Sequence, residues 1–358
     1  MADSPYNWTE VTVVGAGPIG IELAAALKQS GIPYRHLEAG PVGQTFTWWP
    51  HNTTFFSTPE RIAIAGVPIQ TVQQQNLTGE AYLVYLRQVI QYYQLKIQLY
   101  EPVEQLEPVP GGFRLRTRSH GGEQVYYSRK VVLATGGMAG PNRLDIPGED
   151  LPHVSHYFRD PHDYFQQRLL VVGGRNSAIE AALRCWRAGA EVTLSYRRPD
   201  IQRERVKPAL RDDFDTVVRE GRMTFLPATA PVEITPRHAV LAQVQDGQVD
   251  AGRLTHYPAD FILLMTGYTA DMRLFAQAGV QLVGAGQAPQ HDPASMETNV
   301  PGLYVAGTAA GGTQKQFTIF IETAHADVAR IMTALCGQQW QGSYFAGGAN
   351  RPKPNPYE

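Results

Sequence analysis

The hydrophobic and polar positions near the N-terminus follow the order strand, turn, helix, strand. Residues 11–14, VTVV, form a short β-branched run, which predicts a buried strand. Apolar residues at helical spacing follow from Gly20 to Ser30, and Gly31 is well placed to end that helix. The stretch 34–40 predicts a second strand. Together these segments predict a βαβ unit with a right-handed crossover.

The same pattern recurs at residues 169–196, where a strand, a helix and a second strand again follow one another. Three more strands that run into glycine turns are predicted at 130–137, 260–268 and 303–308. A last helix is predicted over residues 316–337. Two βαβ units in one chain predict an α/β fold with two dinucleotide-binding, Rossmann-like domains.

Length and composition narrow the class of protein. The chain has 358 residues, which suits two domains, and its formal net charge of −2 gives no reason to expect nucleic acid. No apolar run approaches the roughly 20 residues of a membrane span, and the polar start MADSPYNWTE lacks the pattern of a secretory signal. We therefore expect a cytoplasmic protein without membrane partners. Residues 342–358, rich in glycine and proline, predict an irregular tail.

A GxGxxG pattern, made by Gly15, Gly17 and Gly20, lies between the first predicted strand and helix. In this context Gly15 permits a tight turn, Gly17 lets the backbone approach a pyrophosphate, and Gly20 allows close helix–strand packing. The helix N-terminus offers its N–H groups to the phosphates. Glu38 closes the second strand, where a carboxylate accepts hydrogen bonds from ribose hydroxyls. The alternative interpretation is a turn that serves packing alone, with Glu38 a surface charge.

The second turn departs from this pattern in its charges. Gly173 and Ala178 take the first and third positions of the fingerprint, but Arg175 takes the middle one. A side chain there pushes the pyrophosphate slightly outward and offers it a cation. Arg197 and Arg198 end the second strand of this unit, where the first unit has its glutamate. Arginine at that point suits a 2′-phosphate, because its planar fork pairs with phosphate oxygens.

One turn thus suits a ribose diol and the other a phosphorylated ribose. This difference predicts FAD in the first unit and NADPH in the second. Two alternatives stay open for the second unit: the arginines are solvated strand-end charges, or Asp200, just behind them, serves NADH instead.

The order of an FAD-type fingerprint, an ATG turn, an NADPH-type fingerprint, a TGY turn and an AG turn resembles that of the thioredoxin-reductase-like flavoproteins. Within them, the chain is most similar to the bacillithiol-disulfide reductase (YpdA) family. The matching stretches are 51–69, 146–158, 171–183, 265–271, 295–312 and 319–328. The resemblance covers almost the whole chain.

The resemblance implies an FAD domain, residues 1–140 and 268–341, that is interrupted by an NADPH domain, residues 141–267, and it implies a homodimer. The helix expected to open at Gln316–Thr318 would point its positive N-terminus at the flavin. The residues expected around FAD are Gly15, Gly17, Pro18, Ile19, Gly20, Glu38, Ala39, Phe56, Val103, Ala134, Thr135, Gly136, Gly307, Thr308, Gln316, Phe317 and Thr318. Those expected around NADPH are Gly173, Gly174, Arg175, Asn176, Ser177, Ala178, Arg197, Arg198 and Gly267.

One departure from the family concerns thiol chemistry. Its bacillithiol reductases carry a cysteine inside the first fingerprint, GPCG, whereas this chain has GPIG with Ile19 in that place. Isoleucine cannot form a mixed disulfide with a thiol substrate. Cys185 and Cys336 lie far apart in the sequence, so we expect neither a redox-active cysteine pair nor a metal site.

The expected function is that of an NADPH-dependent oxidoreductase, which passes hydride from NADPH through FAD to an acceptor without a protein thiol. A small disulfide, a quinone, a ferredoxin and oxygen all stay open as acceptors. A flavin monooxygenase and a non-catalytic nucleotide-binding flavoprotein partner are the alternatives. His51 and His325 are candidates for acid–base catalysis, although a structural hydrogen-bonding role is the commoner one for such residues.

Overall fold

The computed structural model describes residues 8–340 and Gly342, and the described chain divides into two compact units. Unit 1 contains Asn52–Gly140, the described residues up to Thr47 and those from Tyr268 onward. Unit 2 contains Pro141–Gly267 together with the short segment Trp48–His51. The predicted irregular tail lies outside the described residues apart from Gly342.

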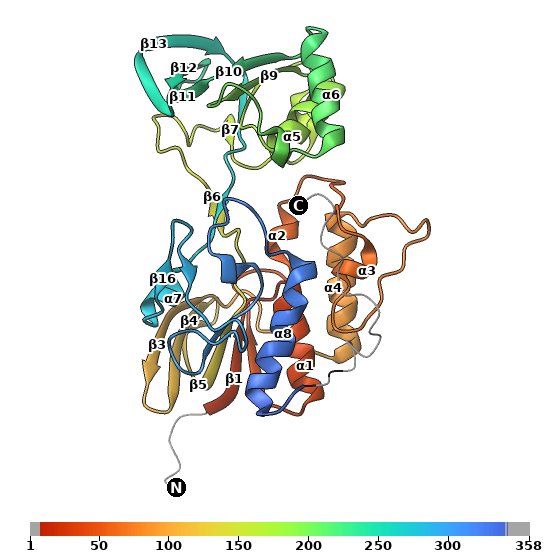
Figure 1. Cartoon of the computed structure of the whole chain (residues 1–358), viewed down its shortest axis with the longest axis vertical. Helices are drawn as coiled ribbons and strands as arrows, with labels where there is room; N and C mark the ends of the chain where they lie inside the picture. The colour runs from red at the N-terminus through yellow and green to blue at the C-terminus, as the bar shows by residue number, and fades with distance from the viewer. Residues whose placement is uncertain (1–7, 341, 343–358) are drawn as a thin grey trace. The chain divides into compact units, whose positions relative to one another are not determined.

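Unit 1 is built on a six-stranded sheet in the order β2-β1-β5-β4-β3, with β18 also paired to β5 (Figure 1). Four of its strands are parallel neighbours: β2 (Tyr34–Leu37), β1 (Trp8–Val14), β5 (Gly122–Leu133) and β18 (Leu303–Val305). Strands β3 (Val103–Val109) and β4 (Gly112–Ser119) continue the sheet in antiparallel fashion. The carboxyl ends of the four parallel strands therefore share one edge of the sheet.

Helix α1 of unit 1 contacts both α4 and α8 (Figure 1). The helices of this unit are α1 (Pro18–Gln29), α2 (Gln44–Thr47), α3 (Pro59–Ile62), α4 (Gly79–Tyr93), α7 (Arg273–Gln277) and α8 (Ile321–Cys336), and a 3₁₀ turn, η3, spans Gly307–Gly311. Fully buried Val13, Leu23, Leu133, Val305 and Val328 share one hydrophobic core, which joins the sheet to α1 and α8. In the same unit β16 (Leu282–Val283) pairs with β17 (Ala288–Pro289). Strand β6 (Gly140–Pro141), where the chain passes from unit 1 to unit 2, pairs with β15 (Tyr268–Thr269).

The start of helix α8 corrects the expectation from the sequence. The helix begins at Ile321 and not at Gln316, so the prediction of a helix N-terminus at Gln316–Thr318 is wrong. The side chain of Gln314 accepts the backbone N–H groups of Thr318 and Ile319 at 3.0 and 3.1 Å. Because these side-chain bonds satisfy the backbone locally, the apolar run before Ile321 stays outside the helix as irregular backbone.

Unit 2 contains a five-stranded parallel sheet in the order β10-β9-β8-β14-β7 (Figure 1). Its strands are β7 (Val154–Ser155), β8 (Arg168–Val172), β9 (Glu191–Tyr196), β10 (Thr224–Pro227) and β14 (Phe261–Leu264). An antiparallel sheet is made by β11 (Thr229–Ile234), β12 (His238–Gln245) and β13 (Gln248–Pro258). The helical segments are α5 (Asn176–Arg187), α6 (Pro208–Arg219), η1 (Pro161–Tyr164) and η2 (Arg203–Arg205).

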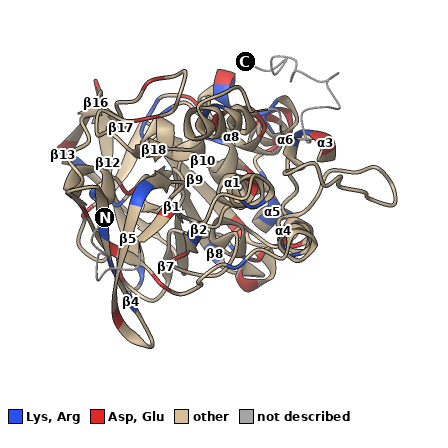
Figure 2. Ribbon diagram, turned by 90° about the horizontal axis from the view of Figure 1, so that it is seen from below, with Lys and Arg blue, Asp and Glu red and all other residues tan. Residues whose placement is uncertain are grey.

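Acidic and basic residues are interspersed along the elements of the chain (Figure 2). This mixture agrees with the formal net charge of −2. No helix in the described part of the chain is long and apolar enough to cross a membrane.

Candidate cofactor-binding sites

The first glycine turn connects β1 to α1 and has a different steric requirement at each glycine. Gly15 has a φ of +108°, and a β-carbon there would lie 2.4 Å from the carbonyl oxygen of Ala134. A β-carbon on Gly20 would lie 2.0 Å from the carbonyl oxygen of Gly15. At Gly17, by contrast, an added β-carbon meets nothing within 4 Å. The fold itself therefore requires Gly15 and Gly20, whereas Gly17 leaves space beside the turn.

Helix α1 begins beside this open space. Its N-cap, Gly17, makes no side-chain capping bond, and Pro18 opens the first turn of the helix. The first N–H groups of a helix need acceptors, and an anion such as a phosphate supplies them. The helix N-terminus therefore fits the pyrophosphate of a dinucleotide.

Glu38 follows β2 and is buried against the glycine turn. Its carboxylate accepts the backbone N–H of Ala16 through one oxygen and that of Gly40, at 2.8 Å, through the other. His36, on the same strand, donates its Nε2–H to the carbonyl of Gly15 at 2.9 Å. Burial lowers the pKa of His36 to about 4, so the ring is neutral at pH 7. His36 was not predicted from the sequence, because a lone histidine in a strand carries no signal of its own.

Two further turns of unit 1 come together with the first. The turn after β5 contains Thr135 and Gly136, and a β-carbon on Gly136 would lie 3.9 Å from Oγ1 of Thr308, in the turn after β18. The Oγ1 of Thr135 is buried and has no hydrogen-bond partner among the described residues. An unsatisfied buried hydroxyl costs about 1–3 kcal/mol, so this group fits a polar ligand. The N–H of Gly307 donates to buried Asp327 at 3.0 Å, which fixes the turn after β18.

The structure does not bring every expected FAD residue to these turns. Phe56 is 60% exposed, and Val103 opens β3, where it pairs with Thr117. Gln316–Thr318 precede α8 and do not form its first turn.

A buried charged cluster joins α1, α3 and α8 beside the core of unit 1. Nδ1 of His325 lies 2.7 Å from the carboxylate of Glu22, and Nε2 of the same ring donates to the carbonyl of Arg61 at 3.1 Å. The side chain of Arg61 is paired with Glu322 at 3.0 Å. Burial lowers the pKa of His325, but the hydrogen bond and charge of Glu22 outweigh it and raise the pKa above its ordinary value. Because both ring nitrogens face acceptors, the contacts favour the imidazolium form of His325, in a structural ion pair with Glu22.

His51 belongs to unit 2, whereas the cluster around His325 belongs to unit 1. Its Nδ1 is 3.2 Å from the carboxylate of Asp160, and its side chain is 53% exposed. The pKa of Asp160 is lowered, first by the backbone N–H of His162 and then by His51. The backbone N–H of His51 donates to the carbonyl of Arg159 at 2.9 Å, so the segment is well anchored.

The second glycine turn, between β8 and α5, repeats the geometry of the first. Gly173 has a φ of +147°, and a β-carbon there would lie 2.5 Å from the carbonyl oxygen of Met265 and 2.8 Å from the β-carbon of Ala178. A β-carbon on Gly174 would lie 2.5 Å from the ring of Tyr196. Helix α5 has Arg175 as its N-cap, without a side-chain capping bond. This helix N-terminus therefore also fits an anion.

Arg197 and Arg198 directly follow β9 and are exposed. Together with Pro199 and the turn between β12 and β13, they line a hollow of about 550 Å³. Its lining residues are Arg197, Arg198, Pro199, Val244, Asp246 and Gly247. A hollow of this size falls within the range of small-molecule sites, and its two arginines outweigh its one aspartate.

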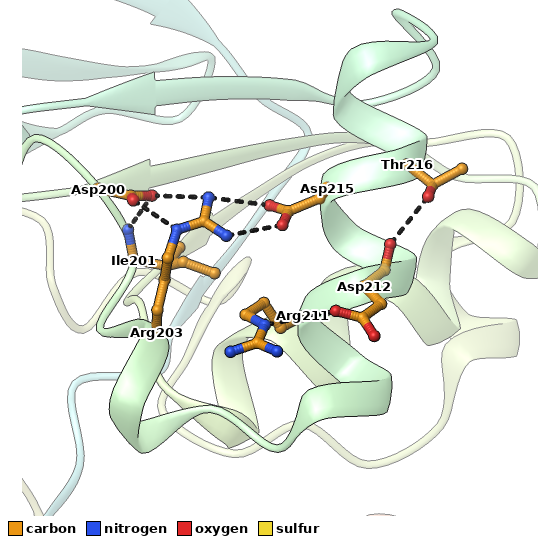
Figure 3. A network of polar contacts seen from close by, with 7 residues as sticks. All are labelled: Asp200, Ile201, Arg203, Arg211, Asp212, Asp215 and Thr216. Atoms are coloured by element: carbon orange, nitrogen blue, oxygen red, sulfur yellow. Dashed lines mark hydrogen bonds and ion pairs between the residues drawn. The ribbon is translucent and has the colours of Figure 1, made fainter.

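Asp200 is engaged by neighbouring groups (Figure 3). One carboxylate oxygen accepts the N–H of Ile201 at 2.8 Å, and the other accepts Nε of Arg203 at 2.7 Å. Arg203 also binds Asp215 at 2.7 Å. The carboxylate of Asp200 is thus held in an ion pair with Arg203, within the segment that follows β9. Gly267, also expected near NADPH, has a φ of +95° and accepts the N–H of Asn142 at 2.9 Å.

A family model described as pyridine nucleotide-disulphide oxidoreductase matches residues 12–307. The chain belongs to this family. It is 32% identical over 311 residues to the bacilliredoxin reductase Bdr of Bacillus subtilis (strain 168). The aligned residues make up 87% of this chain and 92% of that protein. It is 26% identical over 310 residues to a ferredoxin–NADP reductase of Ignicoccus hospitalis, at 83% and 89% coverage.

Solved structures of this oxidoreductase family have the same fold. The bacillithiol disulfide reductase Bdr (YpdA) from Bacillus cereus superposes with a TM-score of 0.85 at 29% identity, covering 92% of this chain and 99% of that one. A thioredoxin reductase from Lactococcus lactis has a TM-score of 0.68 at 21% identity, with 92% and 98% coverage, and shows the fold alone. The predicted resemblance to the bacillithiol-disulfide reductases, the thioredoxin-reductase-like fold with two Rossmann-like units and the oxidoreductase class are confirmed.

The first fingerprint of this chain carries an aliphatic side chain between Pro18 and Gly20. Ile19 is buried in the core of unit 1, and its β-carbon would lie 3.4 Å from a β-carbon placed on Gly307. Cys185 is buried in unit 2, where burial raises the pKa of its thiol to about 12, and Cys336 is exposed at the end of α8. A thiol with so high a pKa is almost entirely protonated at pH 7 and is a poor nucleophile.

Proposed function

We propose that this protein is an NADPH-dependent FAD oxidoreductase, in which unit 1 holds FAD, unit 2 holds NADPH, and no protein thiol takes part beside the flavin. When bound, the two cofactors supply hydride transfer from the nicotinamide to the flavin and onward to an acceptor. The remaining chemistry is that of binding and orientation by the chain's own residues.

The observation that carries this proposal is the contrast between the two βαβ units. Each has an uncapped helix N-terminus after a glycine turn, but the strand that follows ends in buried Glu38 in unit 1 and in exposed Arg197 and Arg198 in unit 2. A carboxylate accepts from a ribose diol and repels a phosphate, whereas a guanidinium binds a phosphate. The two units therefore suit different nucleotides, FAD in the first and NADPH in the second.

In unit 1, the N-terminus of α1 would bind the pyrophosphate over Gly17. Glu38 would accept the adenosine ribose hydroxyls through the lone pairs that its two backbone N–H bonds leave free. The unsatisfied hydroxyl of Thr135 would hydrogen-bond the nucleotide at the turn after β5. Ile19 would present an aliphatic surface where the bacillithiol reductases have a thiol. These roles are orientation and exclusion of water, and none of them requires a titrating group.

The acceptor follows from the same site. Since no thiol lies in the first fingerprint, the acceptor would have to take its electrons from the flavin directly. A ferredoxin-type redox protein is one candidate acceptor, because relatives named ferredoxin–NADP reductases match most of this chain. A one-electron carrier of this kind needs no protein thiol. A small disulfide, a quinone and oxygen remain as further acceptors.

The proposal is tested first on the cofactors. The purified protein should be yellow, and the flavin released by denaturation should be FAD by chromatography. Arg198→Ala should weaken NADPH binding on the order of tenfold or more, since a charge-assisted bond contributes about 1.5–3 kcal/mol, and should leave NADH binding nearly unchanged. A folded protein that is colourless and takes up no FAD would contradict the proposal.

A further inference from the structure

We propose that Arg175 recognises the 2′-phosphate of NADPH, and that Gln202 is a positioning residue that holds its guanidinium for this purpose. The inference rests on the proposed function and identifies which side chains discriminate between NADPH and NADH. It differs from the expectation drawn from the fingerprint, in which Arg175 offers its charge to the pyrophosphate.

The direction of the Arg175 side chain is the first observation. Arg175 is the N-cap of α5, yet its Nε–H donates to the side-chain oxygen of Gln202 at 2.7 Å. Gln202 lies in the segment after β9, four positions beyond Arg198, and is 6% exposed. The guanidinium is therefore held by the segment that follows the strand-end arginines.

The segment after β9 is itself fixed to the fingerprint turn. The N–H of Gln202 donates to the carbonyl of Gly174 at 3.3 Å. The side chain of Asn176 donates to the carbonyl of Arg205 at 3.2 Å and accepts the N–H of Lys207 at 2.8 Å. Because three hydrogen bonds hold the segment in place, the Arg175–Gln202 contact is a built feature and not the chance position of a long side chain.

The electrostatic surroundings point to an anion beside Arg175. The pKa of Arg175 is lowered, by burial first and then by the positive charges of Arg205, Arg198 and Arg197. Three guanidinium groups thus repel that of Arg175, and a dianionic phosphate bound beside it would offset this repulsion. The nearby carboxylate of Asp200 accepts hydrogen bonds from Arg203 and from the N–H of Ile201.

The chemistry of the ligand follows from this arrangement. Planar guanidinium groups bind phosphate oxygens in a bidentate manner, and a hydrogen bond to Nε sets the plane in which the other nitrogens point. The ligand group is therefore a phosphate monoester on the adenosine ribose of a nucleotide whose pyrophosphate lies at the N-terminus of α5.

The test is a set of dissociation constants measured by calorimetry on the FAD-loaded full-length protein, with NADP⁺, NAD⁺ and 2′,5′-ADP as ligands. Arg175→Gln should weaken NADP⁺ and 2′,5′-ADP on the order of tenfold and leave NAD⁺ within about twofold. Gln202→Ala should weaken the same two ligands selectively but less, because the charge remains and only its position is lost. Arg187→Gln is the matched control, since Arg187 lies in the last turn of the same helix and pairs with Asp213. It should change none of the three constants.

Two outcomes overturn the inference in different ways. In the first, the wild type prefers NADP⁺, but Arg175→Gln weakens the binding of NADP⁺ and NAD⁺ equally, or weakens neither. Arg175 then does not bind the 2′-phosphate, although the proposed function still stands. If the wild type binds NADP⁺ no better than NAD⁺, the nucleotide preference in the proposed function fails, and this inference fails with it.

Discussion

At the scale of single residues, the position of Ile19 has a direct consequence for thiol chemistry. The side chain is buried against the turn after β18, so the first fingerprint carries a hydrocarbon at this point. In the proposed function, reduction of the flavin by NADPH would depend on the two nucleotide turns and not on Ile19. We therefore expect rapid flavin reduction together with slow turnover of bacillithiol disulfide.

Ile19→Cys tests this expectation, because it restores a thiol at that place. The variant should raise disulfide turnover, at a stability cost of about 1–2 kcal/mol for the lost hydrocarbon. Steady-state assays with bacillithiol disulfide and urea unfolding measure the two effects. Fast turnover by the wild type, unchanged in Cys185→Ser and Cys336→Ser, would show that the disulfide needs no protein thiol.

The ion pair of His325 and Glu22 makes stability depend on pH. The pKa of His325 is raised in the folded protein, so the stabilisation is fully present below the unfolded value of about 6.5 and is lost as the pH rises through the folded value. His325→Gln should destabilise the protein on the order of 3 kcal/mol at pH 6, because it leaves a buried carboxylate unpaired. The difference from the wild type should shrink by pH 9.

Urea unfolding at the two pH values measures this effect, with His120→Gln as the control on an exposed turn. A destabilisation by His325→Gln that is as large at pH 9 as at pH 6 would mean that the ring is not charged in the folded protein. The pair itself lies beyond sequence reasoning. Glu22 sits in the apolar run IELAAAL, and a buried acid there signals a partner, but only the packing of α1 on α8 brings it to a histidine 303 positions away.

At the scale of elements, the glycines in the strand–turn–helix of unit 1 have two different roles. We expect Gly17 to leave room for FAD, whereas Gly20 is needed for close packing of the turn. Gly17→Ala should leave the free energy of unfolding of the apoprotein nearly unchanged, because an added β-carbon meets nothing within 4 Å, but it should weaken FAD binding markedly. Gly20→Ala should destabilise the apoprotein by about 1–3 kcal/mol, because its β-carbon would overlap the Gly15 carbonyl.

Urea unfolding of the apoproteins and fluorescence titration with FAD distinguish the two variants. An apoprotein of Gly17→Ala that is as destabilised as Gly20→Ala would mean that the turn is a packing device, which is the alternative interpretation of the fingerprint.

The elements that could be predicted from the sequence are those whose signals are local. Gly31 follows the end of α1, and Gly337 caps α8 with a φ of +68°, as their positions after apolar helices indicate. The start of α8 could not be predicted in the same way. The run QFTIF has helical spacing, but Gln314 captures the backbone N–H groups of Thr318 and Ile319, and such a side-chain bond is invisible to hydrophobic periodicity.

At the scale of the whole molecule, each unit has its glycine turns at the carboxyl edge of the parallel strands of its sheet. In unit 1 the turns after β1, β5 and β18 converge, and in unit 2 the turns after β8, β9 and β14 do so. The sequence predicted the two βαβ units and the strands that run into glycine turns, because these signals are local. It did not predict which turns would come together. The electron acceptor could not be predicted, because its recognition depends on the shape and charge of the folded protein's surface and not on a short sequence motif.

The central claim, that NADPH delivers hydride to FAD in this protein, is tested most directly by anaerobic stopped-flow mixing of the FAD-loaded protein with NADPH or NADH. The account predicts loss of the yellow flavin absorbance with NADPH, at a rate that exceeds the rate with NADH at low nucleotide concentration. It predicts the same in Cys185→Ser and Cys336→Ser, because no thiol takes part in this half of the reaction. Flavin that stays oxidised with NADPH, or that is reduced equally fast by both nucleotides, would contradict it.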